Sequence, residues 1–599
     1  MHNLEIAWAF REMAALLEIK GENGFKANAY RQGAEILENM EPVAEMSQGE
    51  MLKVPGLGKT LVANIGELDS SGKLEVLQEL RAEIPPGIIQ ALTLPGVGTK
   101  VAHKLMANLK INSLNDLKAA AKAKQIRTIP GLGPKVEVNI QRGIACLEER
   151  SGRILLVEAR EVVNHLIGFL IKLGVGQVEV AGAVRRGDDM VEQLEIIVDP
   201  GELDLAEFMG VLSKHPLFGG ALVREDIEDQ VVLLGQLSSG VKVIFYLVSK
   251  DEFIPAWLFH TGNQGHWEGL SKLAAARRLS LGPRHFNSQG SSDSEDRNSE
   301  QWAVKAAEQG GVEQLKSAEH LETNVYSALG LPYIAPELRN NHGEIEAALK
   351  GELPKLLQQS DLKGDLHLHS KWSDGVNTIE ELVQAARNRG YEYIAITDHS
   401  RSLVIARGLS IDRLQEQIQQ IRSMNENLTE FRVFTGVETD ILTDGRLDYP
   451  DELLAELDIV VGSIHSGFRQ DGDKLTNRIL GAIQNPHVDI VAHPTGRVLG
   501  RRDPYRVDIQ AILAAAAKYN TALELNSSPD RLDLKAEYCR QAVDLGVKLA
   551  INTDAHAAGA MADTEFGVTV ARKGWVQAKD VINTMGVEEL ANYLSKDNC

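Results

Sequence analysis

The chain has 599 residues, of which 25% are charged, and its formal net charge is −21. This length exceeds what a single hydrophobic core usually holds, so we expect roughly three to five domains. Its three cysteines, Cys146, Cys539 and Cys599, have neither metal-site nor disulfide spacing, which is typical of a reducing cytoplasm. No apolar run is long enough to span a membrane and no signal-peptide pattern is present, so we expect a cytoplasmic protein with no membrane partner. We expect a monomer, and the sequence does not identify any protein partners.

The acidic excess is not spread evenly along the chain. Residues 1–150 contain 18 Lys and Arg and 18 Asp and Glu, so the excess acid lies downstream. Within residues 90–145 there are nine basic residues and only two acidic ones, Asp116 and Glu137. Because phosphate binding depends on the local potential, this basic region outweighs the distant acidic part, and the net charge does not exclude a nucleic-acid partner.

One motif occurs three times in the first 150 residues. Each copy has an apolar residue, Pro and Gly-x-Gly, followed by a helical pattern. The candidate DNA-binding residues are Gly56, Gly58, Lys59, Gly96, Gly98, Lys100, Gly131, Gly133 and Lys135. The glycines allow a tight turn close to a ligand, and the N-terminus of the following helix directs N–H groups at a phosphate. One copy is compatible with an ordinary helical hairpin, but three copies beside lysines predict helix-hairpin-helix domains that bind the DNA backbone.

We expect the chain to divide into six segments. We expect helix-hairpin-helix domains over residues 1–83 and 84–150, an α/β domain over 151–250, a further domain over 251–335, a polar linker over 336–361 and a C-terminal domain over 362–599. Residues 283–309, rich in Ser, Asp, Glu, Asn and Gly, predict a flexible insertion.

Seven short apolar runs in the C-terminal domain each end on a His, Asp or Glu. The runs end at His367 with His369, Asp398 with His399, Glu438, His465, His493, Glu524 with Asn526, and Asp554 with His556. Amphipathic stretches of helical period, such as 379–388 and 411–423, separate most of them. Buried strands that alternate with helices predict a parallel β/α barrel, in which the C-terminal strand ends meet at one mouth.

Histidines concentrate at these strand ends. From Asp361 onward the chain has seven histidines, and only His487 lies elsewhere. A single histidine is usually a structural or surface residue, but six at one topological position, together with Glu438 and Asp554, favour metal binding. Imidazole and carboxylate ligands without thiolate favour Zn, Mn or Fe over Ca or a structural Cys-type zinc site.

Residues 362–556 resemble the PHP (polymerase and histidinol phosphatase) family of trinuclear phosphoesterases, and none of its nine ligand positions is substituted. The resemblance implies a distorted (β/α)7 barrel. The resemblance implies a first metal at His367, His369, Glu438 and Asp554, a second at His465 and His493 with Glu438 as the bridge, and a third at Asp374, His399 and His556. The first four of these ligands are also the expected catalytic residues, and Asp398 is expected to orient a ligand imidazole. Arg401, Arg407 and Arg497 are candidates for clamping phosphate, although a solvated surface role fits the sequence equally well.

The whole chain resembles the bacterial family X DNA polymerases that carry a C-terminal PHP domain. This resemblance makes 84–150 fingers-like, 151–250 a nucleotidyltransferase-like palm and 251–335 a thumb. Gly182, Arg185 and Arg186 are the remnant of the palm motif that grips a nucleotide triphosphate. The three catalytic carboxylates of the family, however, align with Gln193, Glu195 and Ile244. Two Mg ions need a cluster of oxygen ligands, so a single carboxylate argues against Mg binding and polymerisation at the palm.

The favoured hypothesis is a DNA-binding, metal-dependent phosphodiesterase that removes nucleotides from 3′ ends and processes ends in base excision repair. Its expected partner is gapped, nicked or 3′-ended DNA, held by the hairpins and by a palm whose polymerase site has decayed. Three alternatives stay open: an active gap-filling polymerase with an exonuclease, a small-molecule phosphatase, and a non-catalytic DNA-end scaffold.

Overall fold

The computed structural model describes residues 3–595 except 23, 39–42, 44, 45, 72, 93, 95, 96, 150, 151, 219, 221, 228, 229, 238, 239 and 289–317. The chain forms two compact units. Unit 1 comprises Met1–Ile154, Gly168–Val178 and Glu192–Lys250, and unit 2 comprises Leu155–Ile167, Glu179–Val191 and Asp251–Cys599. Of the helices in these described ranges, none combines the length and apolar character that crossing a bilayer requires.

The N-terminal part of unit 1 is helical. Its helices are α1 Asn3–Lys20, α2 Gly24–Glu38, α3 Gln48–Met51, α4 Lys59–Ser71, α5 Glu75–Glu83, α6 Pro86–Ala91, α7 Thr99–Asn108, α8 Leu114–Lys122 and α9 Pro134–Glu149. Fully buried side chains such as Phe10, Leu17, Ile65 and Leu105 pack into a single apolar core. Because the same core includes residues before and after position 84, the two helical segments expected as separate domains share it.

All three predicted hairpins place a helix directly after Gly-x-Gly. Helices α4, α7 and α9 begin at Lys59, Thr99 and Pro134. Gly56 and Gly131 have φ of 97° and 76°, a left-handed conformation that glycine adopts without a Cβ penalty. The corresponding Gly96 lies outside the described residues. The helix that the motif predicts is confirmed in each copy.

A mixed sheet completes unit 1. Its strands, in order across the sheet, are β2 Gln177–Val180, β4 Gln193–Asp199, β7 Lys242–Leu247, β6 Gln230–Gln236 and β5 Val223–Ile227. Helix α12 Leu205–Ser213 belongs to the same unit, whereas α11 Gly182–Arg186 and β3 Met190–Val191 belong to unit 2. The boundary between the units falls within β1 Ile154–Leu155, α10 Leu156–Leu173 and β2. The ring of Trp8 lies 4.8 Å from that of Phe169 and 4.3 Å from that of His215, which attaches α1 to this part of the unit.

Unit 2 contains a region that precedes the barrel. Its elements are α13 Phe253–Thr261, α14 Gln264–Ala276, the antiparallel pair β8 Leu279–Gly282 and β9 His285–Ser288, α16 Ala318–Ala328 and α17 Glu344–Lys350. Leu258, Leu270, Tyr326 and Ile334 share its core. Arg339 is fully buried and donates hydrogen bonds of 2.6 and 2.8 Å to Glu322.

Two expectations about this region change. The insertion expected over 283–309 begins as strand β9, and its residues 289–309 lie outside the described part of the chain. The linker expected over 336–361 is structured, because it carries α17 and packs Leu338 and Ile345 into the same apolar core.

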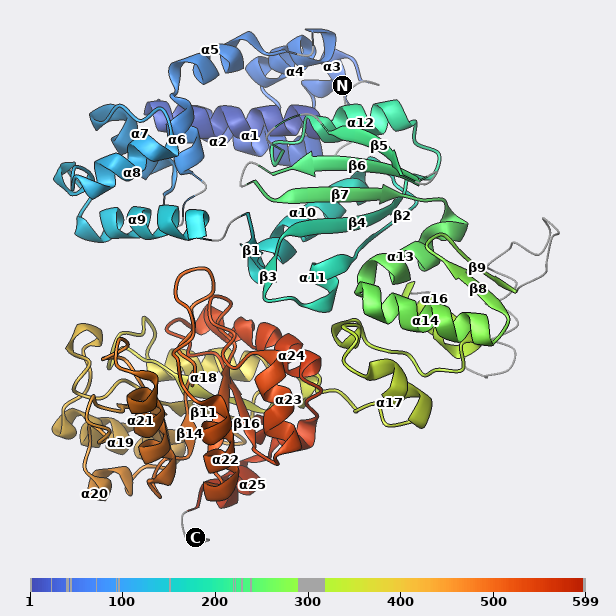
Figure 1. Cartoon of the computed structure of the whole chain (residues 1–599). Helices are drawn as coiled ribbons and strands as arrows, with labels where there is room; N and C mark the ends of the chain where they lie inside the picture. The colour runs from blue at the N-terminus through green and yellow to red at the C-terminus, as the bar shows by residue number, and fades with distance from the viewer. Residues whose placement is uncertain are drawn as a thin grey trace. The chain divides into compact units, whose positions relative to one another are not determined.

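The C-terminal part of unit 2 is the predicted barrel. Its seven strands are β10 Gly364–Leu368, β11 Tyr393–Ile396, β12 Arg432–Asp440, β13 Ile459–Ser463, β14 Ile490–Val491, β15 Ala522–Asn526 and β16 Leu549–Asn552. The helices are α18 Ile379–Asn388, α19 Ile411–Asn425, α20 Asp451–Leu454, α21 Gly472–Gln484, α22 Ile509–Tyr519, α23 Ala536–Asp544, α24 Thr564–Lys573 and α25 Val587–Leu594. Neighbouring strands pair in parallel and in chain order, and helices surround them (Figure 1). The expected distorted (β/α)7 barrel is confirmed.

The first and last strands meet at both ends of their seam. At the mouth, Leu368 bridges to Ala555 in parallel, and the His369 N–H donates to the Ala555 carbonyl over 3.0 Å. At the other end, the Asn583 side chain donates to the carbonyls of Gly364 and Ile551 over 3.1 and 3.0 Å. The barrel is therefore nearly closed, and the strand ends surround one mouth.

Candidate metal centre

The barrel strands bring all nine predicted ligands to its mouth. His367 lies on β10, Glu438 lies on β12, and the others follow β10, β11, β13, β14 or β16: His369, Asp374, His399, His465, His493, Asp554 and His556. Two of these residues have left-handed backbone, with φ of 29° at His493 and 55° at Asp554. Such strain in residues other than glycine is concentrated at functional sites.

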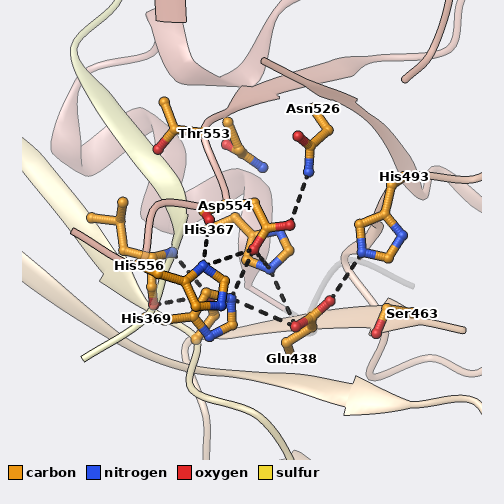
Figure 2. A network of polar contacts seen from close by, with 12 residues as sticks. His367, His369, Glu438, Ser463, His493, Asn526, Thr553, Asp554 and His556 are labelled. Carbon is orange, nitrogen blue, oxygen red and sulfur yellow. Dashed lines mark hydrogen bonds and ion pairs between the residues drawn. The ribbon is translucent and has the colours of Figure 1, made fainter. Parts of the chain in front are cut away.

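Glu438 lies at the centre of the ligand cluster (Figure 2). Its Oε2 lies 2.7 Å from Nδ1 of His399, 3.5 Å from Nε2 of His367 and 3.6 Å from Nε2 of His369. His369 Nε2 is also 3.0 Å from Asp554 Oδ1. One carboxylate oxygen thus faces three imidazoles, two of them beside a second carboxylate.

The other oxygen of Glu438 faces a different pair of imidazoles. Its Oε1 lies 3.2 Å from His493 Nε2 and 3.3 Å from His465 Nε2. A carboxylate whose two oxygens serve separate sets of nitrogen ligands has the geometry of a bridge between two cations.

A further set of ligand atoms surrounds Asp374. Its Oδ1 lies 3.4 Å from His556 Nε2 and 3.6 Å from His399 Nε2. Three overlapping groups of ligand atoms each fall within 4.8 Å: His369, Asp374, His399 and His556; His367, His369 and Asp554; and His399, Glu438 and His465.

The chemistry of these atoms fits bound cations. Among the described residues, His367 Nε2, His369 Nε2, His399 Nδ1 and Glu438 Oε2 are buried and have no hydrogen-bond partner. Buried polar atoms are normally hydrogen-bonded, so lone pairs that face one another require another partner. Burial and the adjacent His399 lower the pKa of His369 to about 4, which keeps that imidazole in the neutral form that binds metals. Burial opposes ionisation of Asp554, but His367 and His369 hold its pKa well below its usual value.

Two carboxylates that the sequence did not identify as partners of the ligands fix the imidazoles. Glu524 is fully buried and its Oε1 lies 2.7 Å from Nδ1 of His367, while Asp440 Oδ1 lies 2.8 Å from Nδ1 of His465. Each carboxylate makes Nδ1 the protonated nitrogen, which leaves the Nε2 lone pair facing the cluster. The position of Asp440, two residues after Glu438 on the same strand and therefore on the same face, was a usable signal.

Asp398 does not take its expected role. Its carboxylate accepts hydrogen bonds from Ser370 N and Oγ, Ser373 N and Oγ, and Gln417 Nε2, rather than from a ligand imidazole. A residue next to a histidine along a chain that leaves a strand points away from it, so Asp398 holds the loop after β10 in place.

Arg497 is also not free to clamp phosphate. Its Nη2 donates to Asp189 Oδ2 over 2.8 Å and to the Leu532 carbonyl, and its Nε donates to the Arg531 carbonyl over 2.9 Å. Arg401 is bound to Asp448 over 3.2 Å, and Arg407 is exposed. The guanidinium beside the cluster is that of Arg531, whose Nε lies 3.8 Å from Asp554 Oδ2.

The palm residues lie where the alignment placed them. Gln193 and Glu195 are on β4, and Glu195 pairs in register with Ile244 on β7. Tyr246 Oη lies 3.4 Å from Glu195 Oε1. In the described part of the chain, no group of three or more potential metal ligands includes Glu195.

The triphosphate-motif arginines are engaged within unit 2. Arg185 donates to Glu322 over 2.8 and 3.1 Å and lies over the ring of Trp257, 3.3 Å from its centroid. Arg186 donates to the Thr261 carbonyl over 2.8 Å and to Asp188 over 2.7 Å. Gly182 begins α11 with φ of 60°.

The second glycine of each hairpin leaves room above the backbone. A Cβ built on Gly58, Gly98 or Gly133 would meet no atom within 4 Å. Lys59 and Lys135 lie on the first turns of α4 and α9, and Lys100 lies on the first turn of α7. A helix N-terminus with open space and a lysine beside it can receive a backbone phosphate.

Known families match four parts of the chain. Residues 365–528 match the PHP domain, 1–74 a helix-hairpin-helix domain, 89–145 a SAM-like helix-hairpin-helix tandem, and 256–340 the DNA polymerase beta thumb. The barrel and its ligand cluster therefore define a PHP-type phosphoesterase, joined to domains that indicate DNA binding.

A full-length relative fixes the family. The chain is 36% identical over 604 residues to the DNA polymerase/3′-5′ exonuclease PolX of Bacillus subtilis (strain 168), with 100% of both chains covered. The chain belongs to the family X DNA polymerases that carry a C-terminal PHP domain.

Shorter relatives match about two fifths of the chain. A probable phosphatase of Thermoanaerobacter sp. (strain X514) is 30% identical over 243 residues, which cover 39% of this chain and 94% of the relative. A probable phosphatase of Syntrophotalea carbinolica is 29% identical over 241 residues, which cover 38% and 90%.

Proposed function

We propose that this chain is a DNA-bound, metal-dependent phosphodiesterase that removes nucleotides from 3′ ends, and that it processes DNA ends in base excision repair. The proposal places catalysis in the barrel and DNA binding in the hairpins. The observation that carries it is the convergence of nine imidazoles and carboxylates, Glu438 among them, at the mouth of the barrel, with buried lone pairs that face one another. The full-length relative is named as a 3′-5′ exonuclease.

The ligand cluster fits three divalent ions, which we take to be Zn, Mn or Fe. The first would be held by His367, His369, Glu438 and Asp554, the second by Glu438, His465 and His493, and the third by Asp374, His399 and His556. When bound, such ions supply an activated water at neutral pH and neutralise the charge of a phosphodiester.

The chain's own residues orient this chemistry. Glu524 and Asp440 hold His367 and His465 in the required tautomer. Arg531 is the phosphate-binding cation, because its guanidinium lies beside Asp554 at the cluster. Arg497 is a positioning residue, since it binds the carbonyls of Arg531 and Leu532 and thereby fixes the segment that presents Arg531.

The palm serves as a scaffold for DNA and does not polymerise. Gln193 and Ile244 offer no carboxylate beside Glu195, so the oxygen ligands that two Mg ions need are missing. Both arginines of the triphosphate motif are held by side-chain or backbone acceptors of unit 2. Template-dependent extension of a gapped primer by a His369→Ala variant would contradict this part of the proposal.

A 3′-exonuclease assay on the metal-analysed, full-length protein tests the proposal. We expect release of nucleotides from a 3′-recessed duplex by the wild type and loss of that activity in His369→Ala, with DNA binding retained. Unchanged activity in His369→Ala would instead support a non-catalytic scaffold whose metals are structural.

A second candidate is a small-molecule phosphatase, favoured by the shorter relatives, which are named as probable phosphatases. A small-molecule phosphatase would not need the three helix-hairpin-helix motifs, so this candidate does not explain their presence. Faster hydrolysis of a small phosphomonoester than of a 3′-recessed duplex, compared as kcat/KM, would favour it.

A further inference from the structure

Exposed apolar side chains gather at the mouth of the barrel. Among the described barrel residues, the exposed large apolar side chains are Val376, Val404, Ile405, Phe468, Tyr519 and Leu545. The first four lie on loops that follow β10, β11 and β13, at the end of the barrel where the ligand cluster lies. Tyr519 ends α22 and Leu545 follows α23, so both lie at the opposite end. Apolar surface is therefore concentrated on the rim of the candidate active site, where exposed patches usually mark a binding function.

One part of this rim is an aromatic stack. The rings of Phe468 and Tyr505 are nearly parallel, at 17°, with centroids 5.6 Å apart. The guanidinium of Arg502 lies 4.6 Å from the Phe468 centroid and 5.7 Å from the Tyr505 centroid. These similar separations place Arg502 beside the pair, not across Phe468 from Tyr505. Phe468 remains 39% exposed, so this mouth stack, formed by Phe468, Tyr505 and Arg502, keeps an open aromatic surface.

The mouth stack is fixed to a turn that carries a predicted metal ligand. The Tyr505 N–H donates to the Thr495 carbonyl over 2.7 Å, and Arg502 Nε donates to the Gly496 carbonyl over 2.8 Å. The Gly496 N–H donates in turn to the His493 carbonyl over 2.8 Å. Gly496 has φ of 58°, and a Cβ there would meet the Tyr505 ring at 1.9 Å. The stack is therefore held at a set position next to His493.

The other end of the stack follows a second predicted ligand. Phe468 lies three residues after His465, and Tyr505 Oη donates to the Ile464 carbonyl over 3.4 Å. An aromatic pair that served only packing would bury both rings, whereas Phe468 stays open to solvent between two loops that each carry a ligand.

We propose that the mouth stack is a nucleobase-binding subsite of the phosphoesterase, and this rests on the proposed function of the barrel. Every nucleobase has a flat π face, so stacking on Phe468 holds a nucleotide without selecting its sequence. The Arg502 cation adds attraction to both the aromatic face and a nearby phosphate. A base stacked there would place the phosphodiester of its nucleotide at the rim of the cluster that contains His465 and His493.

Two single-stranded oligonucleotides that differ only at the 3′-terminal nucleotide test the subsite. One ends in a normal nucleotide and the other in a tetrahydrofuran abasic nucleotide. Since stacking of one base contributes on the order of 1–3 kcal/mol, we expect the wild type to prefer the base-bearing end by roughly 5- to 150-fold in kcat/KM. Phe468→Ala should bring this ratio close to one, and Phe468→Trp should preserve it.

Tyr519→Ala is the matched control. Tyr519 is 40% exposed and lies under a lysine, Lys518, 4.8 Å from its ring centroid, but at the opposite end of the barrel. Its removal should leave the ratio unchanged. Equal ratios for the wild type and Phe468→Ala, or loss of the preference in Phe468→Trp, would overturn the subsite.

A binding measurement separates failure of the subsite from failure of the proposed function. The full-length His369→Ala protein is titrated into an oligonucleotide with 2-aminopurine at its 3′ end, whose fluorescence falls on stacking. We expect quenching with His369→Ala and its loss in the His369→Ala, Phe468→Ala double variant. Equal quenching would refute the subsite, whereas absence of hydrolysis by the wild type on any DNA would refute only the exonuclease.

Discussion

Replacement of Glu524 by Gln should weaken metal binding although Glu524 is not expected to be a metal ligand. Its Oε1 faces His367 Nδ1 and the Asn552 amide, over 2.7 and 3.1 Å. Its Oε2 accepts from the His493 N–H and the Asn526 amide, over 2.8 and 3.2 Å. Gln has one acceptor oxygen and one NH2 group, so in either orientation two buried donors face another donor.

The size of the effect follows from these hydrogen bonds. Leaving a buried donor unsatisfied costs about 1–3 kcal/mol, and removal of a partner that orients a ligand histidine typically lowers metal affinity by roughly 10- to 100-fold. We therefore expect the apparent metal Kd of Glu524→Gln to rise by roughly 10- to 100-fold, with much of kcat restored at saturating metal.

Titration of metal against a competing chelator measures the metal Kd. Exonuclease rates across metal concentrations show whether saturating metal restores kcat. Glu416→Gln is the control, because it makes the same change from carboxylate to carboxamide at an exposed position on α19. It should leave the metal Kd unchanged. An unaltered metal Kd in Glu524→Gln would refute the role assigned to Glu524, and a fall in kcat that saturating metal does not restore would point to a direct part in the reaction.

Three further predictions concern other parts of the molecule. Burial opposes ionisation of Glu322, but its arginine partners lower its pKa to about 2. The carboxylate therefore stabilises the fold fully above its unfolded pKa of 4.5, and this stabilisation decreases as the pH falls toward 2. The destabilisation of Glu322→Gln in urea unfolding, about 3–5 kcal/mol near neutral pH, should shrink steadily below about pH 4.5, and a constant value would contradict the ion pair. Replacement of Lys59, Lys100 or Lys135 by Ala should make the dependence of duplex-DNA affinity on salt less steep. The magnitude of the slope of log affinity against log salt should fall by about 0.9 for every phosphate that the lysine neutralises. An unchanged slope would show that the lysine does not contact the DNA backbone. Arg531→Ala should lower kcat/KM for DNA by roughly 10- to 100-fold, whereas Arg540→Ala, at a half-buried arginine on α23 that pairs with Asp544, should not. Equal effects would refute phosphate binding by Arg531.

The sequence predicted the ligand cluster because its signal is local and repeated. Each ligand ends a strand, and the parallel order of strands alone brings strand ends together. The helix bounds 379–388 were recovered in full, because Thr378 and Glu381 form a capping box that marks the N-terminus of α18.

Interactions between residues far apart in the chain could not be predicted in this way. Arg497 follows a strand end, as a phosphate clamp should, but its partner Asp189 is 308 positions away in the chain and nothing in the local sequence signals the pair. Likewise, the polar composition of 336–361 predicted a linker, whereas burial of Arg339 against Glu322 and packing of Ile345 are tertiary effects. The local sequence pattern identifies which residues lie at the barrel mouth. Tertiary structure determines which of them already form hydrogen bonds with other residues of the protein.

The position of Asn583 has a consequence for synthesis of the protein. Its amide joins Gly364 at the start of the barrel to Ile551 near its end, after more than 200 intervening residues have been made. Until Asn583 has left the ribosome, no hydrogen bonds from its side chain join the first and last strands at this end. The nascent barrel therefore cannot be fully closed. A chain terminated shortly before residue 583 would thus contain every predicted metal ligand. It would lack the hydrogen bonds that join the first and last strands of the barrel at this end.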